Sequence, residues 1–182
     1  MIIQDAEERM KKSYATLEDE FNSMRTGRAS AGLFERIKVN YYGQSTPLNQ
    51  AATISVPEAR LVVIQPWDKS LLNEIEKAIQ KSELSVNPSN DGKVIRIQIP
   101  PLTEERRKEL VKMAKNTAEQ SKVAVRNIRR DANDELKKLM KNGDISEDDE
   151  KRATDEIQKL TDKYSERMNS LLEEKEKEIM EV

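Results

Sequence analysis

The chain has 182 residues, of which 36% are charged and only 4% aromatic, and its formal net charge at pH 7 is −2. It contains no Cys and no His, which excludes disulfides, thiolate nucleophiles and zinc sites with Cys or His ligands, and removes the side chain most used for proton transfer near neutral pH. Ordinary soluble domains carry about 25% charged residues, so this composition favours long solvated helices over a deep core.

The N-terminal segment resembles neither a signal peptide nor a transit peptide, because four of the six residues from Asp5 to Met10 are charged. No stretch approaches the roughly 18 apolar residues that a membrane span needs. The single glycine of Asn90–Lys93 indicates a turn rather than a phosphate-binding loop. We therefore expect a cytoplasmic protein without membrane contact, metal or other cofactor.

The first segment, residues 2–26, is predicted to be an amphipathic helix. Its apolar residues follow a near-heptad repeat, which gives one continuous stripe. The stripe consists of Ile3, Ala6, Met10, Tyr14, Leu17, Phe21 and Met24.

Residues 30–102 have a different pattern, typical of a small α+β unit. Apolar residues alternate with polar ones from Ile37 to Tyr41, and short β-prone runs follow at 52–56 and 61–65, separated by Pro57. An amphipathic helix is expected at 70–82. Strands at 84–86 and 94–99 are then expected on either side of the Asn90-Asp91-Gly92 turn.

Three aromatic residues of this unit have two possible roles. We interpret Trp67, the only tryptophan, as a cap on the core of the small unit, with a contact surface as the alternative. The pair Tyr41-Tyr42 is interpreted as packing rather than stacking on a base.

A second long helix is predicted from Thr103, which looks like an N-cap followed by Glu104 and Glu105. Gly143 is the next helix breaker, so this helix has about 38 residues and a length of about 57 Å. Its expected inward stripe consists of Leu110, Met113, Thr117, Ser121, Ala124, Ile128, Ala132, Glu135 and Leu139.

A third helix is predicted to begin after Ser146, which has Asp149 three residues later as in a capping box, and to end near residue 180. The connection of residues 141–145 is short, so the second and third helices are antiparallel neighbours. The first helix supplies the third apolar stripe of the bundle. The expected stripe of the third helix is Ala153, Ile157, Leu160, Tyr164, Met168, Leu171 and Ile179.

The predicted architecture is an α+β fold that is mostly α. It is an elongated three-helix bundle, residues 1–29 and 103–182, with a small β/α/β domain inserted at 30–102. Both crossings carry residues that stop helices or bend the chain, and these two adjacent linkers are predicted to act as a hinge. The expected hinge residues are Gly27, Ser30, Gly32, Pro100 and Pro101.

Charge is unevenly distributed between the two long helices. Residues 104–141 hold twelve Lys or Arg against seven Asp or Glu, whereas residues 142–182 hold seven against fourteen. On a helical wheel, eight of these twelve basic residues lie opposite Ala124 and Ile128, with Glu119 among them. They are Lys108, Lys112, Lys115, Lys122, Arg126, Arg129, Arg130 and Lys137.

Such a band has two interpretations. A charge run is often only a solvated helix face. The centre of this band, however, is rich in arginine, from Arg126 to Arg130, and the planar guanidinium fork binds phosphates in bidentate fashion. A rigid helix with this face suits structured RNA, whose recognition rests on phosphate and 2′-hydroxyl contacts. RNA binding is our hypothesis for this face.

Separated motifs along essentially the whole chain resemble the ribosome recycling factor family. The most specific is the run from Val123 to Asp134, Val-Ala-Val-Arg-Asn-Ile-Arg-Arg-Asp-Ala-Asn-Asp. The others are Arg25-Thr26-Gly27-Arg28-Ala29-Ser30, Tyr41-Tyr42-Gly43, Thr46-Pro47-Leu48, the run Pro100–Arg107, Ile145–Asp149 and Ile157–Asp162.

The resemblance implies a non-catalytic translation factor. It would act as a monomer on the post-termination ribosome, with the bundle on large-subunit ribosomal RNA, and would split the ribosome together with elongation factor G. The small domain would be the part that elongation factor G pushes. The family's key RNA-contacting arginine falls on Arg129, and weaker correspondences fall on Arg126, Arg130, Lys122, Arg25 and Arg28.

Two other function classes fit part of the sequence. A coiled-coil adaptor fits the heptad-like stripes but not the inserted domain, and sedimentation would separate it from a monomeric factor. An enzyme could use a carboxylate pair such as Asp148 and Asp149. Acidic residues in the first turn of a helix have a simpler role at the helix dipole, so we expect no catalytic residues.

Overall fold

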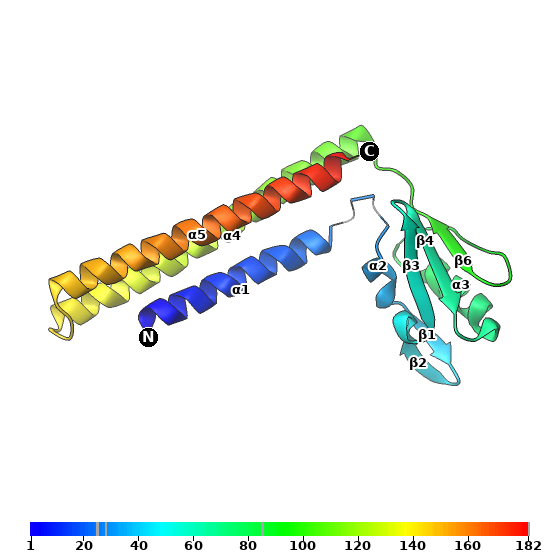
Figure 1. Ribbon diagram of the computed structural model, residues 1–182, viewed down its shortest axis with the longest axis horizontal. Helices are drawn as coiled ribbons and strands as arrows, with labels where there is room; N and C mark the ends of the chain where they lie inside the picture. The colour runs from blue at the N-terminus through cyan, green and yellow to red at the C-terminus, as the bar shows by residue number, and fades with distance from the viewer. Residues whose placement is uncertain (25, 28, 85, 182) are drawn as a thin grey trace. The chain divides into compact units, whose positions relative to one another are not determined.

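The computed structural model describes residues 1–24, 26–27, 29–84 and 86–181 (Figure 1). The chain forms two compact units, one of Met1–Thr26 with Thr103–Val182 and the other of Gly27–Leu102. The first unit is a helical bundle and the second is a small α+β unit, which confirms the predicted fold class.

Three long helices make the first unit: α1 (Ile2–Asn22), α4 (Glu104–Lys141) and α5 (Glu147–Met180). Each helix packs against both of the others. Fully buried side chains from all three fill the centre. The largest of these are Met10, Leu17, Ile157, Tyr164 and Met168.

The starts of the two longest helices are fixed by side-chain caps, as predicted. The Thr103 hydroxyl accepts the Arg106 N–H at 3.1 Å, and α4 then runs for 38 residues. At the start of α5, Ser146 and Asp149 form a reciprocal capping box. Hydrogen bonding to Ser146, first through its side chain and then through its backbone N–H, holds the pKa of the Asp149 carboxyl below its usual value. Gly143, with φ +78°, turns the chain between α4 and α5.

The buried band of α4 differs from the predicted stripe. Ile128, Ala132 and Leu110 are buried as expected, but Met113 is 47% exposed and Glu135 is exposed. The stripe was wrong at these positions because α4 packs against two helices at once, so the buried band is centred between α1 and α5. The residues of this band are Leu110, Ala114, Ala118, Val125, Ile128, Ala132 and Leu136.

The other two helices also differ in detail from the prediction. Helix α1 ends at Asn22 rather than near residue 26. In α5 the predicted core positions Leu160 and Leu171 are only half-buried, whereas Thr161 and Lys175 are buried. Polar side chains can take core positions when their polar atoms find partners, and the Thr161 hydroxyl donates to the Ile157 carbonyl at 2.9 Å.

The second unit contains two antiparallel sheets. Strands β1 (Lys38–Tyr41) and β2 (Gln44–Pro47) form a hairpin. The larger sheet has the order β3-β4-β6-β5. Its strands are β3 (Ala52–Glu58), β4 (Leu61–Pro66), β5 (Pro88–Asn90) and β6 (Ile95–Gln98), and the helices of the unit are α2 (Gly32–Glu35) and α3 (Leu72–Lys81), with 3₁₀ turns at Leu48–Gln50 and Lys69–Leu71.

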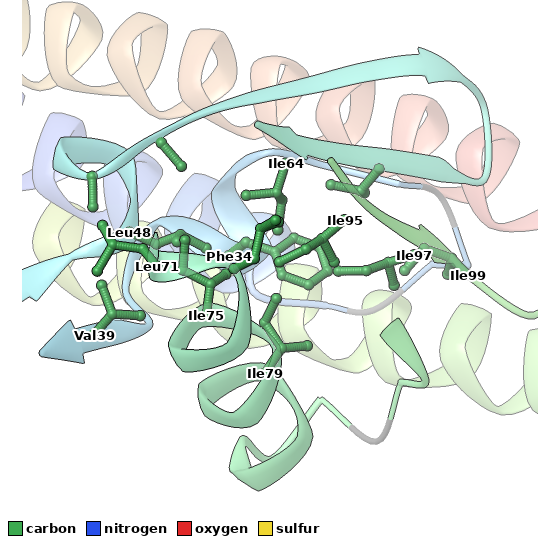
Figure 2. Close-up of a cluster of buried hydrophobic side chains, with 14 residues drawn as sticks. Phe34, Val39, Leu48, Ile64, Leu71, Ile75, Ile79, Ile95, Ile97 and Ile99 are labelled. Atoms are coloured by element: carbon green, nitrogen blue, oxygen red, sulfur yellow. The ribbon is translucent and has the colours of Figure 1, made fainter. Parts of the chain in front are cut away.

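The core of this unit lies between α3 and one face of the larger sheet. Figure 2 shows Ile75 and Ile79 of α3 beside Ile64, Ile95 and Ile97 of the sheet. Full burial of each such side chain stabilises the fold by about 1.5–3 kcal/mol relative to an exposed one. Phe34 of α2 and Leu48 complete the cluster, so the small unit has a core of its own.

Several strand predictions for this unit need correction. Pro57 lies within β3, and the turn to β4 comes at Ala59 and Arg60. The strand expected at 84–86 is instead Pro88–Asn90, while Leu84 and Val86 pack on the core and Ser85 lies outside the described residues. Both β2 and β5 are short and mostly polar, so the alternation of apolar residues did not reveal them.

The exposed aromatic residues contradict the packing interpretation. Trp67 is 64% exposed and its indole N–H donates to the Thr53 hydroxyl at 3.0 Å, so it does not cap the core. Tyr42 is 82% exposed at the β1–β2 turn, with φ +51°, and its hydroxyl donates to Asp68 at 3.0 Å. Tyr41 is half-buried, so only this member of the pair packs on the core.

One acidic side chain organises the β5–β6 turn and predicts how the stability of the small unit depends on pH. Asp91 accepts the backbone N–H groups of Val94 and Lys93, at 3.0 and 2.9 Å, and a hydrogen bond from Arg96. These contacts, the Val94 bond first, place the pKa of Asp91 well below its usual range. A depressed pKa means that the ionised form stabilises the folded state above the unfolded pKa of about 4, and that this contribution is lost as the pH falls.

We therefore expect Asp91→Asn, which removes the charge but keeps an acceptor oxygen, to be less stable than the wild type at pH 7. The difference should narrow as the pH falls below about 4. Denaturant unfolding followed by the fluorescence of Trp67, the only tryptophan, reports the small unit. An equal difference at pH 7 and pH 3 would contradict this role of Asp91.

Candidate nucleic-acid interface

The basic side chains of α4 form a band along the helix that lies beside its buried face. The sequence placed the band opposite the core. Because the buried residues are centred on Ala118 and Val125, the band is only roughly a third of a turn away. Burial follows this geometry, since the side chain of Lys122 is 21% exposed and that of Lys108 is 71% exposed.

Two members of the band share one carboxylate. Arg126 donates to Glu119 at 2.8 Å, and the Lys122 ammonium lies 3.8 Å from the other oxygen of that carboxyl. The Arg126 hydrogen bond is the main reason why the pKa of Glu119 is lowered. The three side chains carry a net positive charge, and an RNA phosphate could replace Glu119 as a partner of Arg126.

Arg129 is half-buried and tied to the neighbouring helix. Its guanidinium donates to the Gln158 side-chain oxygen of α5 at 3.3 Å, and Gln158 in turn donates to Asp162 at 3.0 Å. A guanidinium carries five N–H donors, so Gln158 can orient Arg129 while other donors remain for a phosphate. The sequence placed Arg129 well away from the core, and this part of the expectation was wrong.

Asp131, which follows the arginine-rich run, pairs with a side chain of another helix. Asp131 forms an ion pair with Arg9 of α1 at 3.0 Å. Its neighbour Arg130 is exposed. Because Asp131 faces α1, its charge is drawn toward that helix and away from Arg130.

Toward the start of α4, the lysines of the band are paired with carboxylates. Lys108 lies 3.3 Å from Glu104, and Lys115 lies 4.0 Å from Glu176 of α5. Exposed pairs of this kind stabilise a fold by only about 0–1 kcal/mol. The arginine-rich centre of α4 is therefore the stronger candidate for an anion contact.

Sequence reasoning missed Gln158 and Arg9, which contact the band or its flank from other helices. Gln158 lies in the run Ile157–Asp162, but its contact with Arg129 depends on the register between α4 and α5. No pattern within one helix gives that register.

The predicted site and hinge residues at the crossings have different surroundings. Arg25 and Arg28 lie outside the described residues. Gly27 has φ +78°, and a Cβ built on it would meet the Leu102 side chain at 2.9 Å, so both the backbone and the packing require glycine there.

The remaining hinge candidates are partly structured. Ser30 is exposed, and Gly32 begins the short helix α2. Pro100 and Pro101 are exposed in an irregular segment before α4.

Within the described ranges, no group of three or more acidic side chains could hold a metal ion. Among the helices of those ranges, none is long and apolar enough to cross a membrane.

Comparison with known proteins gives a consistent result. The family model described as "Ribosome recycling factor" matches residues 17–180. The ribosome-recycling factor of Treponema denticola is 66% identical over 177 residues, covering 97% of this chain and 96% of the relative. That of Halalkalibacterium halodurans is 61% identical over 181 residues, covering 100% and 98%.

Two solved structures share the fold. A solution structure of the ribosome recycling factor matches with a TM-score of 0.78 at 49% identity, covering 100% of this chain and 96% of that one. The second, at 49% identity and a TM-score of 0.65, covers 99% and 97%, and describes the Thermus thermophilus ribosome recycling factor and Escherichia coli elongation factor G bound to the E. coli post-termination complex. The resemblance seen in the separated motifs is therefore confirmed, and the chain belongs to the ribosome recycling factor family.

Proposed function

We propose that this protein binds the post-termination ribosome and, with elongation factor G, separates it into subunits so that it leaves the messenger RNA. The observation that carries the proposal is the family match over residues 17–180, together with relatives more than 60% identical over nearly the whole chain. The family consists of non-enzymatic translation factors, so the protein acts by binding and movement and needs no cofactor. Its place of action is the cytoplasm, as a monomer.

The basic band of α4 is our proposed surface for large-subunit ribosomal RNA. Arg129, Arg126, Arg130 and Lys122 would contact phosphates there, and Arg25 and Arg28 join them through the family resemblance alone. The rigidity of α4 supports this proposal, because a capped helix of 38 residues holds the spacing of its cations constant. The acidic α5 would be repelled by the same RNA, so the bundle would bind with one defined face.

The small domain is our proposed lever. We place it at Gly27–Leu102, three residues longer at its start than the 30–102 expected from the sequence, with the bundle at Met1–Thr26 and Thr103–Val182. The proposed hinge residues are Gly27, Ser30, Gly32, Pro100 and Pro101, at or near the two ends of this unit. The positive φ of Gly27 supports a special role for the first crossing. Elongation factor G would push this domain while the bundle stays anchored on RNA.

The RNA surface is tested by Arg129→Ala. We expect the free energy of binding to the large subunit to weaken by about 1–3 kcal/mol, because a charge-assisted phosphate contact is lost. The slope of log affinity against log salt concentration should flatten by about one unit. Arg129→Lys should restore only part of the affinity, since an ammonium cannot reproduce the fork. Binding is measured at several salt concentrations.

Stability and a matched control complete this test. Loss of the Gln158 hydrogen bond should destabilise the bundle by only about 0.5–1.5 kcal/mol, so Arg129→Ala should remain folded in thermal melts. Arg152→Ala removes an exposed arginine from the acidic α5 and should bind like the wild type. If Arg129→Ala binds as tightly as Arg152→Ala, the basic band is not the RNA surface.

The lever is tested by deleting the small unit. Replacing Gly27–Leu102 by a short glycine-serine linker should leave a folded helical bundle, because α1, α4 and α5 share a core of their own. We expect this variant to bind ribosomes with near wild-type affinity and to fail in splitting them with elongation factor G. Light scattering of ribosomes follows the splitting. A variant that still splits them would show that the small domain is not a lever.

A further inference from the structure

A small polar cluster holds the end of the first bundle segment to α5. In the described part of the chain, the buried polar or charged side chains are Thr26, Thr161 and Lys175. The Thr161 hydroxyl donates a hydrogen bond to the Ile157 carbonyl of the same helix. Thr26 and Lys175, by contrast, meet at a third side chain, Glu178.

Both oxygens of Glu178 have a partner. Oε1 accepts a hydrogen bond from the Thr26 hydroxyl at 3.0 Å, and Oε2 accepts one from the Lys175 ammonium at 3.1 Å. The Lys175 side chain is only 8% exposed. The carboxylate is therefore held on one side by a buried cation and binds Thr26 with the other.

Stability alone is a weak reason for such a cluster. Lys175 is buried but the Glu178 side chain is 34% exposed, and the attraction in such a half-buried ion pair is largely offset by desolvation and solvent screening. A hydrogen bond differs from an apolar contact in its directionality, because it weakens steeply away from its preferred geometry. The cluster therefore fixes Thr26 at one place along α5, which an apolar contact would do less strictly.

That place is the last residue of the bundle before the first crossing. Gly27, which follows Thr26, belongs to the small unit and packs closely on Leu102 at the second crossing. Thr103, which follows Leu102, caps α4.

The two ends of the small unit are held together as well. The Ala29 N–H donates to the Ala59 carbonyl and the Ile99 N–H donates to the Arg60 carbonyl, each at 2.7 Å. Both ends of the unit are therefore bound to the β3–β4 turn. The place at which Thr26 is held on the bundle therefore bears directly on the first crossing.

We propose that Glu178 is a positioning residue for ribosome splitting, which sets the pivot of the small domain by anchoring Thr26 to α5. The inference rests on the proposed function, because a pivot matters only if the small domain acts as a lever. It assigns a task to the end of α5 that is separate from the RNA contact of α4. Lys175 acts through Glu178 by orienting that carboxylate through the 3.1 Å hydrogen bond.

The test uses the full chain with Thr26→Val, which removes the hydroxyl at nearly constant volume. The protein has no cysteine, so spin labels can be placed at Asn169→Cys on α5 and Asn73→Cys on α3, both of which are exposed positions. We expect a broader distribution of label distances than in the unsubstituted labelled protein. Splitting should slow by about twofold to tenfold, the range that the loss of one hydrogen bond gives, while ribosome affinity stays unchanged.

Three controls separate positioning from folding. Thr161→Val makes the same substitution at a buried site within α5 and should change neither the distances nor the splitting rate. Thr26→Ser keeps the hydroxyl and should behave like the wild type. With the ion pair replaced by Lys175→Met and Glu178→Leu, the distribution should already be broad, and Thr26→Val should broaden it no further.

The outcomes are distinct. Unchanged distances in Thr26→Val, or broader distances with an unchanged splitting rate, would overturn the assignment of Glu178. Equal broadening by Thr26→Val with and without the ion pair would also overturn it. A wild type that does not split ribosomes would instead defeat the proposed function, while the distance measurement would still decide whether Glu178 anchors the crossing.

Discussion

The packing of α4 against both α1 and α5 is the constraint on which the other features depend. Its buried band includes Ala114 and Ala118, both fully buried, and small side chains let helix axes approach closely. Because α4 packs against both α1 and α5, its rotation about its own axis is fixed. That rotation places Arg129 within reach of Gln158 on α5, while Arg126 pairs with Glu119 of its own helix.

The same packing puts a basic helix beside an acidic one. Residues 104–141 have an excess of cations and residues 142–182 an excess of anions. The ion pair that Lys115 of α4 forms with Glu176 of α5 is long and largely solvated, so it contributes little stability. The separation of charge is better understood as a field with a direction, which attracts an anionic partner to one side of the bundle and keeps it from the other.

The features that were predictable from sequence are the locally determined ones. Thr103 and the pair of Ser146 and Asp149 define helix starts within three residues, so their caps could be recognised without the fold. The buried band of α4 was harder, because it depends on two partner helices. Trp67 was misjudged because an apolar side chain can remain at the surface, and more than half of the surface of a folded protein is apolar. The contact between Thr26 and Glu178 joins residues 152 positions apart and leaves no pattern in either segment.

The meeting of Gly27 with Leu102 has a consequence for how the bundle assembles. Helices α4 and α5 are joined by a short turn and can pair early, whereas α1 can join them only after the whole of Gly27–Leu102 has been closed into a loop. Closing a flexible loop loses entropy that grows by about 0.6 kcal/mol with each doubling of its length, and such non-local contacts slow folding. A folded small unit already has its two ends bound to one turn. The loop that remains to be closed when α1 docks on α4 and α5 is therefore effectively much shorter than the full insertion. The insertion should therefore fold first and speed the docking of α1, which makes it an internal folding template for the bundle that it interrupts.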